Sequence, residues 1–133
     1  MTHLIQIKTI KSEDKGTLSF FEGKNDLGFN IKRIFYTYNV PIGESRGGHA
    51  HREIWQFLFC PFGKIEVIAD NGWNKMTFVL ESPDIGILVP NGIWLDLKWI
   101  DSSSVLCVAA SDIYNEDEYI RDYQEFKRFV CDN

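Results

Sequence analysis

The amino-acid sequence predicts an all-β fold, a sandwich or barrel, that ends in one α-helix. Apolar and alternating runs of β type follow one another from residue 4 to about residue 110, and turn residues separate them at short intervals. Only the C-terminal segment changes to a helical period. The β-type runs are residues 4–10, 18–21, 29–40, 55–60, 64–70, 76–82, 85–90, 93–100 and 104–111.

The connections between these runs contain turn-forming residues. Asp70-Asn71-Gly72 predicts a hairpin, because Asn-Gly accepts the positive φ of a tight turn. The C-terminal helix is expected over about residues 115–130, where Asn115 and Glu118 resemble a capping box. We expect its apolar stripe to pack against the barrel, and the alternative is that it covers a subunit interface. The stripe consists of Tyr119, Ile120, Tyr123, Phe126 and Val130.

Length and composition limit the classes of protein. The chain has 133 residues and 44% hydrophobic content, which fits one domain over residues 1–133. The net charge of −5 and the absence of a basic run argue against nucleic acid as a partner. No apolar run approaches the roughly eighteen residues of a membrane span, and the N-terminus lacks the apolar block of a signal peptide, so we expect a cytoplasmic protein. Cys60 and Cys107 lie in apolar runs and are expected in the core.

Two histidines stand two residues apart in the segment SRGGHAHREIWQ, residues 45–56. On a strand, His49 and His51 point to the same face, so both imidazoles are expected to enter one cavity. This geometry suits a metal site and a pair of acid–base groups equally well.

The spacing around the pair reproduces the first motif of the cupin superfamily, which the chain resembles: Gly43, five residues, His49, one residue, His51, four residues, Gln56, six residues, Gly63. Cupins are small jelly-roll barrels, in agreement with the strand pattern. Metal-binding members have glutamate at the position of Gln56 and histidine at that of Leu95. Because two of four ligands are absent, we expect a site without metal or cofactor.

Three longer segments, residues 29–51, 82–97 and 109–129, resemble the sugar 3,4-ketoisomerases that act on dTDP-4-keto-6-deoxyglucose. The blocks RGGHAH and DEYIRDY are specific to that group. The resemblance implies an isomerase that moves a ketone from C4 to C3 of a nucleotide-linked hexose through an enediol. It also implies a homodimer that supplies a 3-keto sugar to an aminotransferase in amino-sugar biosynthesis.

The histidine chemistry agrees with this activity. An imidazole titrates near neutral pH and moves protons in both directions. We assign His49 as the base on carbon and His51 as the shuttle on the oxygens, with the reverse order as the alternative. A phenol from the preceding strand is expected near them, and Tyr36 and Tyr38 are both candidates, because register decides which faces the cavity.

The substrate diphosphate requires cations, and Arg33 and Arg46 are the candidates because a guanidinium binds phosphate oxygens in pairs. Arg46 is favoured because it is next to the histidines, whereas Arg33 has a surface salt bridge as its alternative. Gly47 and Gly48 either let the backbone approach the ligand or form an ordinary turn.

Two positions, Lys15 and Leu95, fall where the resembled family varies, and both are expected at the substrate. Because leucine donates no proton, the sequence does not choose between the gluco and galacto products. Two alternatives to the isomerase are an epimerase on the same barrel, which pairs its histidine with a carboxylate, and a non-catalytic cupin that binds sugar nucleotides. A metal-dependent cupin enzyme is disfavoured by the ligand count.

Overall fold

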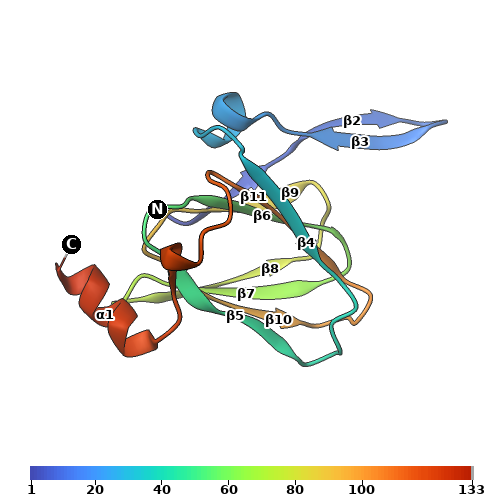
Figure 1. The fold of residues 1–133 in the computed structure, drawn as a ribbon. Helices are drawn as coiled ribbons and strands as arrows, with labels where there is room; N and C mark the ends of the chain where they lie inside the picture. Colours follow the sequence, from blue (N-terminus) through green and yellow to red (C-terminus); the bar gives the residue numbers. More distant parts are fainter. Residues whose placement is uncertain (133) are drawn as a thin grey trace.

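Two antiparallel five-stranded sheets face each other in the computed structural model, which describes residues 1–132 (Figure 1). The predicted all-β fold is therefore confirmed. The first sheet has the order β1 (His3–Gln6), β9 (Ile85–Val89), β6 (Gln56–Phe62), β11 (Val105–Ala110), β4 (Arg33–Thr37). The second has the order β12 (Tyr119–Ile120), β5 (Ser45–His51), β10 (Trp94–Trp99), β7 (Ile65–Asp70), β8 (Lys75–Leu80).

The main core fills the space between the two sheets. Alternation places it there: Ile65, Val67 and Ala69 of β7 are buried, and the residues between them are half-buried. β6 and β9 are buried more continuously, because the N-terminal segment also covers the outer face of their sheet with Ile7 and Leu27. The predicted hairpin at residues 70–72 is confirmed, since β7 pairs with β8 directly across this turn.

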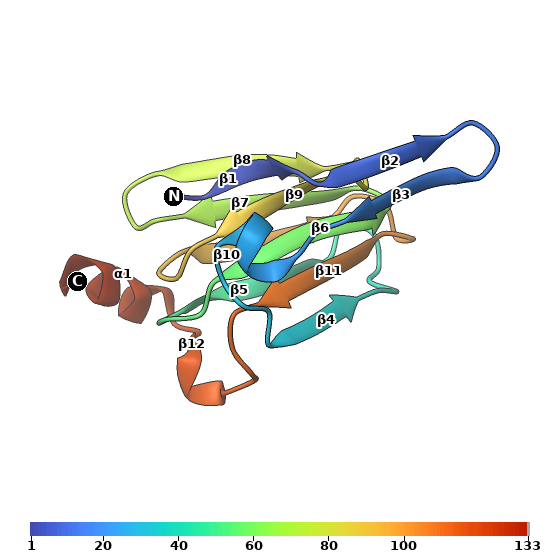
Figure 2. The same cartoon turned by 90° about the horizontal axis from the view of Figure 1, so that it is seen from above.

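The N-terminal segment forms two elements where the sequence suggested one strand. Ile7 is buried and its N–H donates to the carbonyl of Asp84, which ends β1. The chain then leaves the barrel as a separate hairpin of β2 (Lys8–Ser12) and β3 (Gly16–Phe20), which projects beyond both sheets (Figures 1 and 2). One π-helical turn, Gly23–Leu27, returns it to the barrel.

The C-terminal helix begins later than predicted. Asn115 caps a short 3-10 turn, Glu116–Glu118, and the chain then extends as β12 and pairs with β5. Helix α1 spans Tyr123–Asp132 and starts after Asp122, whose carboxylate accepts from the N–H of Gln124. The predicted packing against the barrel is confirmed, because Phe126 is fully buried beside Ala50, Trp94 and Ile120.

Within residues 1–132, no helix has both the length and the apolar composition needed to cross a membrane.

Candidate active site

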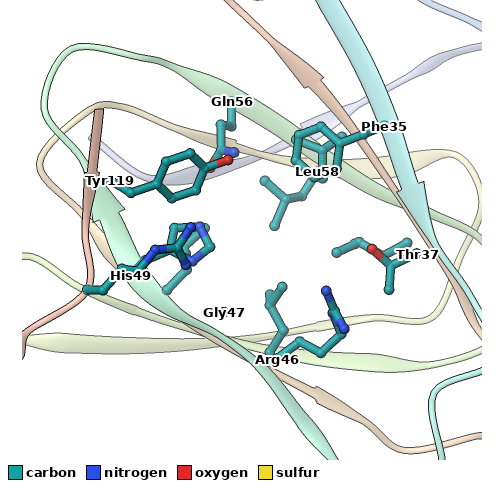
Figure 3. Close-up of a pocket in the computed structure, with 13 residues that line it drawn as sticks. Phe35, Thr37, Arg46, Gly47, His49, Gln56, Leu58 and Tyr119 are labelled. Carbon is teal, nitrogen blue, oxygen red and sulfur yellow. The ribbon is translucent and has the colours of Figure 1, made fainter. Parts of the chain in front are cut away.

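One pocket between the sheets takes side chains from both of them (Figure 3). Its volume of about 250 Å³ is below the usual range of about 300–1,000 Å³ for ligand pockets, so it fits a small molecule or one part of a larger one. The wall combines five aliphatic side chains with six polar ones, and the polar groups lie on more than one side, with His49 and Tyr119 across the cavity from Thr37 (Figure 3). The lining residues are Phe35, Thr37, Arg46, Gly47, His49, Gln56, Leu58, Leu95, Leu97, Leu106, Val108, Tyr119 and Arg121.

A β-bulge in β5 brings Arg46 and His49 to the pocket together. Residues three apart on a regular strand face opposite sides of the sheet. Here Leu95 of β10 pairs with His49 and the next residue of β10 pairs with Gly47, so Gly48 is the additional residue of the bulge. Gly47 and Gly48 have φ angles of 92° and 69°, and a Cβ on Gly47 would lie 2.6 Å from the carbonyl oxygen of Leu95. The bulge therefore requires both glycines for its own backbone.

The rings of His49, His51 and Tyr119 pack against one another at one side of the pocket. The centroids of His49 and His51 are 5.4 Å apart, and the Tyr119 ring lies 5.0 Å from His49 and 4.5 Å from His51. Pairing of β12 with β5 sets this arrangement, since Tyr119 is opposite His51 in the ladder. His49 and Tyr119 line the pocket, and His51, which is 4% exposed, packs against both rings.

Burial lowers the pKa of both imidazoles, because a charged ring loses its hydration there. For His51 the pKa falls to about 3, and the positive charges of His49, Arg33 and Arg121 add to the effect of burial. His51 is therefore neutral at neutral pH. The predicted role of His51 as a shuttle on substrate oxygens stays a prediction, and both of its ring nitrogens have no hydrogen-bond partner within residues 1–132.

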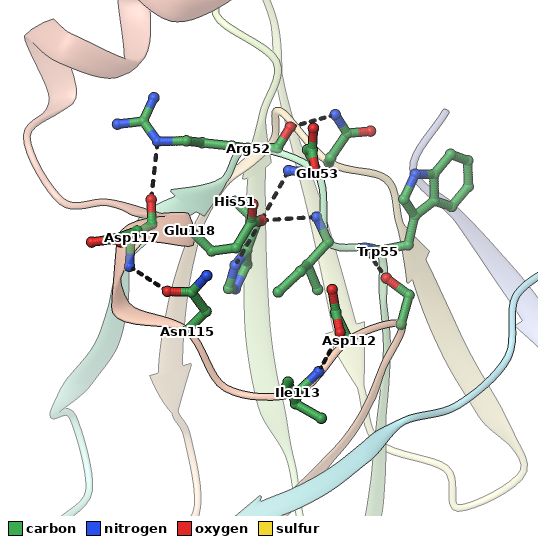
Figure 4. A network of polar contacts seen from close by, with 12 residues as sticks. His51, Arg52, Glu53, Trp55, Asp112, Ile113, Asn115, Asp117 and Glu118 are labelled. Atoms are coloured by element: carbon green, nitrogen blue, oxygen red, sulfur yellow. Dashed lines mark hydrogen bonds and ion pairs between the residues drawn. The ribbon is translucent and has the colours of Figure 1, made fainter.

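Glu118 lies beside His51 (Figure 4). Its Oε1 accepts from the backbone N–H groups of Glu53 and Ile54 at 2.9 and 3.0 Å, and it is 3.9 Å from Nδ1 of His51. The carboxylate therefore fastens the C-terminal segment to the turn that follows β5. These two hydrogen bonds hold the segment next to Tyr119 against the barrel.

The register of β4 turns the predicted tyrosines away from the pocket. Phe35 and Thr37 line it, while Tyr36 and Tyr38 are 63% and 57% exposed and stack on each other at 5.9 Å. The expectation that one of the two faces the cavity is therefore wrong. The phenol of the pocket comes instead from Tyr119.

Two guanidinium groups line the pocket. Arg46 does so as expected, and Arg121 joins it, held by Glu116 through contacts of 2.9 and 3.2 Å. Arg33 is half-buried outside the lining and packs 5.0 Å from the ring centroid of Phe35. Its Nε and Nη2 are buried and have no hydrogen-bond partner within residues 1–132. The salt bridge considered as its alternative role is not formed in the described part of the chain.

Two predicted substrate positions remain, Leu95 and Lys15, and only Leu95 lines the pocket. Leu95 is buried in the wall opposite His49 in the ladder. Lys15 is exposed in the turn of the projecting hairpin, so it does not contribute to the pocket of its own chain (Figure 2).

Sequence reasoning did not find Tyr119, Arg121 or Glu118 as site residues. The signal was present in the block DEYIRDY, because Tyr119 and Arg121 are two apart and share a face when the segment is extended. The segment was interpreted as a helix, and in a helix Tyr119 and Arg121 do not share a face.

Among residues 1–132, no three His, Cys, Asp or Glu side chains gather in a way that could hold a metal ion. Gln56 and Leu95, which replace the glutamate and histidine of metal-binding cupins, both line the pocket. A metal-independent site stays a prediction.

Two antiparallel sheets around a histidine pocket define a cupin-like barrel. Comparison with known proteins identifies the family within this class. The model of the family FdtA, described as WxcM-like, C-terminal, matches residues 1–131. The TDP-4-oxo-6-deoxy-alpha-D-glucose-3,4-oxoisomerase of Aneurinibacillus thermoaerophilus is 36% identical over 119 residues, which is 90% of this chain and 86% of the relative.

Solved structures agree with this relationship. A 3,4-ketoisomerase from Helicobacter canadensis superimposes with a TM-score of 0.93 at 35% identity, over 98% of this chain and 97% of that one. The sugar 3,4-ketoisomerase QdtA from Thermoanaerobacterium thermosaccharolyticum, in complex with TDP, gives 0.94 at 30% identity, over 98% and 95%. The chain therefore belongs to the FdtA/WxcM-like family of dTDP-sugar 3,4-ketoisomerases, and the predicted cupin jelly-roll with a C-terminal helix is confirmed.

Proposed function

We propose that this protein converts dTDP-4-keto-6-deoxyglucose into the corresponding 3-keto sugar by proton transfer alone. One observation carries the proposal. Among the side chains that line the pocket, His49 is the single group that exchanges a proton near neutral pH, and burial lowers its pKa so that the free base prevails. The 36% identical relative is named as an oxoisomerase of this substrate, which supports the choice of sugar.

In this mechanism the hexose occupies the pocket with C3 and C4 facing His49. The C4 ketone acidifies the C3–H, and the neutral imidazole removes that proton. The oxygen on C4 gains a proton as the enediol forms, and the hydroxyl on C3 loses one as the ketone appears at C3. His49, whose proton exchanges with solvent in the meantime, delivers a proton to C4. No oxidant or reductant is consumed, because the electrons move within the sugar. A positioned base of this kind contributes on the order of 10² to 10⁴ in rate.

The cations near the pocket suit the charge of the nucleotide. The pocket is too small for a whole sugar nucleotide, so the diphosphate extends toward its mouth. The guanidinium groups of Arg46 and Arg121 line the pocket, and each can bind phosphate oxygens in pairs. We assign the diphosphate to Arg46, because Arg121 is already held by Glu116.

We also propose that two copies of the chain associate through the hairpin β2–β3. Among the described elements each of these strands pairs only with the other. The hairpin exposes apolar side chains: Ile10 and Leu18 are 58% and 60% exposed. A second copy would cover this surface. Because Lys15 lies in the hairpin turn, it can reach only the pocket of a partner chain.

The decisive experiment uses the purified protein with dTDP-4-keto-6-deoxyglucose in deuterated buffer, followed by proton NMR of the sugar. We expect a 3-keto product with deuterium at C4, and coupling constants then identify the gluco or galacto product. His49→Asn is the matched control and should be silent. Inversion at C3 and C5 would replace the proposal by an epimerase, and binding without exchange would replace it by a sugar-nucleotide-binding protein.

A further inference from the structure

Gln56 is a buried polar side chain whose amide has no partner in the rest of the protein. It is the first residue of β6, it lines the pocket, and it is 3% exposed. Within residues 1–132 no hydrogen bond engages this amide. A primary amide has two N–H donors and a carbonyl oxygen that accepts two hydrogen bonds. Because buried polar groups in folded proteins almost always have partners, the free amide requires an explanation.

The neighbours of Gln56 in the sheet offer it no hydrogen bond. Gln56 is opposite Ala110 of β11 and Val89 of β9, and Leu58 follows it on the same face of β6. None of these three side chains has a polar atom, and the backbone groups of the strands pair with one another in the ladders. The side chain extends toward the cavity in Figure 3, so the cavity is the direction left for its hydrogen bonds.

An unpartnered amide at this position lowers the stability of the fold. Burial removes the amide from water, and no protein group replaces the lost hydrogen bonds. A leucine of similar volume would fill the same space without this loss. A side chain that lowers stability while it faces a ligand cavity is typical of a functional position. The amide of Gln56 is therefore suited to a ligand that has both an acceptor and a donor to offer.

The place of Gln56 relative to Arg46 indicates which part of the sugar it meets. The two side chains come from different sheets and lie on opposite sides of the cavity (Figure 3). In the proposed function Arg46 binds the diphosphate, which is attached to C1 of the hexose. C1 and C4 are opposite corners of a pyranose ring. A hexose with C1 toward Arg46 therefore presents C4, and C3 beside it, to the side of the cavity where Gln56 lies.

We infer that Gln56 binds the two adjacent oxygens between which the ketone moves. Its N–H donates to the ketone oxygen on C4, and its carbonyl oxygen accepts from the hydroxyl on C3. This inference rests on the proposed function. The amide takes no proton itself; it positions C3 and C4 for His49, which approaches from the other sheet. A half-turn about the terminal bond of the side chain exchanges donor and acceptor and so fits the product, in which ketone and hydroxyl have changed places.

Gln56→Leu tests the inference through two ligands, dTDP and dTDP-6-deoxyglucose. The second carries hydroxyls on C3 and C4 but no ketone, so its binding is measured by calorimetry without any reaction. We expect its Kd to rise on the order of 10- to 100-fold, and kcat/KM for the keto sugar to fall at least as much, while the Kd for dTDP stays within about threefold. The midpoint of thermal unfolding should equal or exceed that of the wild type, because the amide has no protein partner to lose.

The matched control is Gln124→Leu, which removes an exposed amide on α1 and should change neither binding nor kcat/KM. Equal weakening of both ligands by Gln56→Leu would mean that the side chain shapes the pocket, and a lower unfolding midpoint would mean that it supports the fold. Either result overturns the inference, as does an unchanged Kd for dTDP-6-deoxyglucose. A wild type that isomerises no sugar overturns the proposed function, whereas the expected difference between the two ligands would still identify Gln56 as a hexose-binding residue.

Discussion

The N-terminal hairpin β2–β3 and the C-terminal segment of β12 and α1 differ in where their apolar side chains go. The hairpin leaves the barrel and exposes Ile10 and Leu18. The C-terminal segment pairs with β5 and buries Ile120 and Phe126 completely. It also delivers Tyr119 to the pocket. One end of the chain thus completes the site of its own barrel, whereas the other end presents a surface that a second chain can cover.

The largest effect is expected where the C-terminal segment is buried most deeply. Phe126→Ala should destabilise the fold by about 3–5 kcal/mol, because the ring has 0% exposure and packs on Trp94 and Ile120. Urea unfolding followed by circular dichroism measures it. Phe62→Ala is the control, since that ring is 64% exposed and its loss should cost no more than about 0.5 kcal/mol. A loss below 1 kcal/mol for Phe126→Ala would show that α1 contributes little to stability.

A substitution in the exposed hairpin β2–β3 should change the association of two chains rather than the stability of the fold. We expect Leu18→Asp to weaken the proposed dimer at least about 100-fold, which equals about 2.7 kcal/mol, because it places a charge on the apolar hairpin. Sedimentation equilibrium measures the dissociation constant. Ile113→Asp provides the comparison, since Ile113 is 64% exposed but lies outside the hairpin. An unchanged constant for Leu18→Asp would separate the hairpin from any dimer contact.

A smaller effect is expected where the C-terminal segment meets the turn after β5. Glu118→Ala should cost about 1–3 kcal/mol, because it leaves the N–H groups of Glu53 and Ile54 without their acceptor. Glu118→Gln keeps an acceptor oxygen and should cost less. Glu125→Ala breaks only a half-exposed ion pair with Arg52 and should cost at most about 1 kcal/mol. Thermal unfolding compares the three variants, and equal losses would contradict the special position of Glu118.

The pH dependence of stability tests how completely β12 covers His51. In the unfolded chain an imidazole has a pKa near 6.5, whereas in the fold the pKa of His51 is lowered to about 3. The unfolded state therefore binds an additional proton as pH falls below about 6.5. His51 stabilises the fold fully above that value and progressively less toward pH 3, by up to about 1.4 kcal/mol per pH unit.

His51→Gln should therefore give a flatter fall in unfolding free energy between pH 6.5 and 4 than the wild type, as measured by urea unfolding at each pH. His3→Gln is the control, because the His3 side chain is exposed. Identical slopes for wild type and His51→Gln would mean that His51 is accessible to solvent.

Sequence patterns predicted the strands of the barrel well. Each strand has either alternating apolar and polar residues or a continuous apolar run, and both patterns are visible among neighbouring residues. They failed at residues 115–120. Tyr119 and Ile120 fit one face of a helix, but pairing with His51 and Ala50 makes them a strand, and that contact joins residues about seventy apart in the chain. Local spacing contains no information about such a partner.

The same limit applies to the site. The motif on β5 identified Arg46 and His49 correctly as pocket residues, because its glycines and histidines are neighbours in sequence. The register of β4 was left open, and it proved to turn Tyr36 and Tyr38 outward. Tyr119 was missed because its role depends on β12, the element that was interpreted as a helix.

Because of the bulge at Gly48, the number of residues in β5 decides which of its side chains face the pocket. Because this one additional residue restores Arg46 and His49 to the same side of the sheet, a relative that lacks it would keep the barrel and the histidine while its arginine pointed outward. Insertions and deletions of a single residue here change which charges face a ligand without changing the fold. The number of residues between this arginine and this histidine is therefore as informative for comparing homologues as the identities of the two residues themselves.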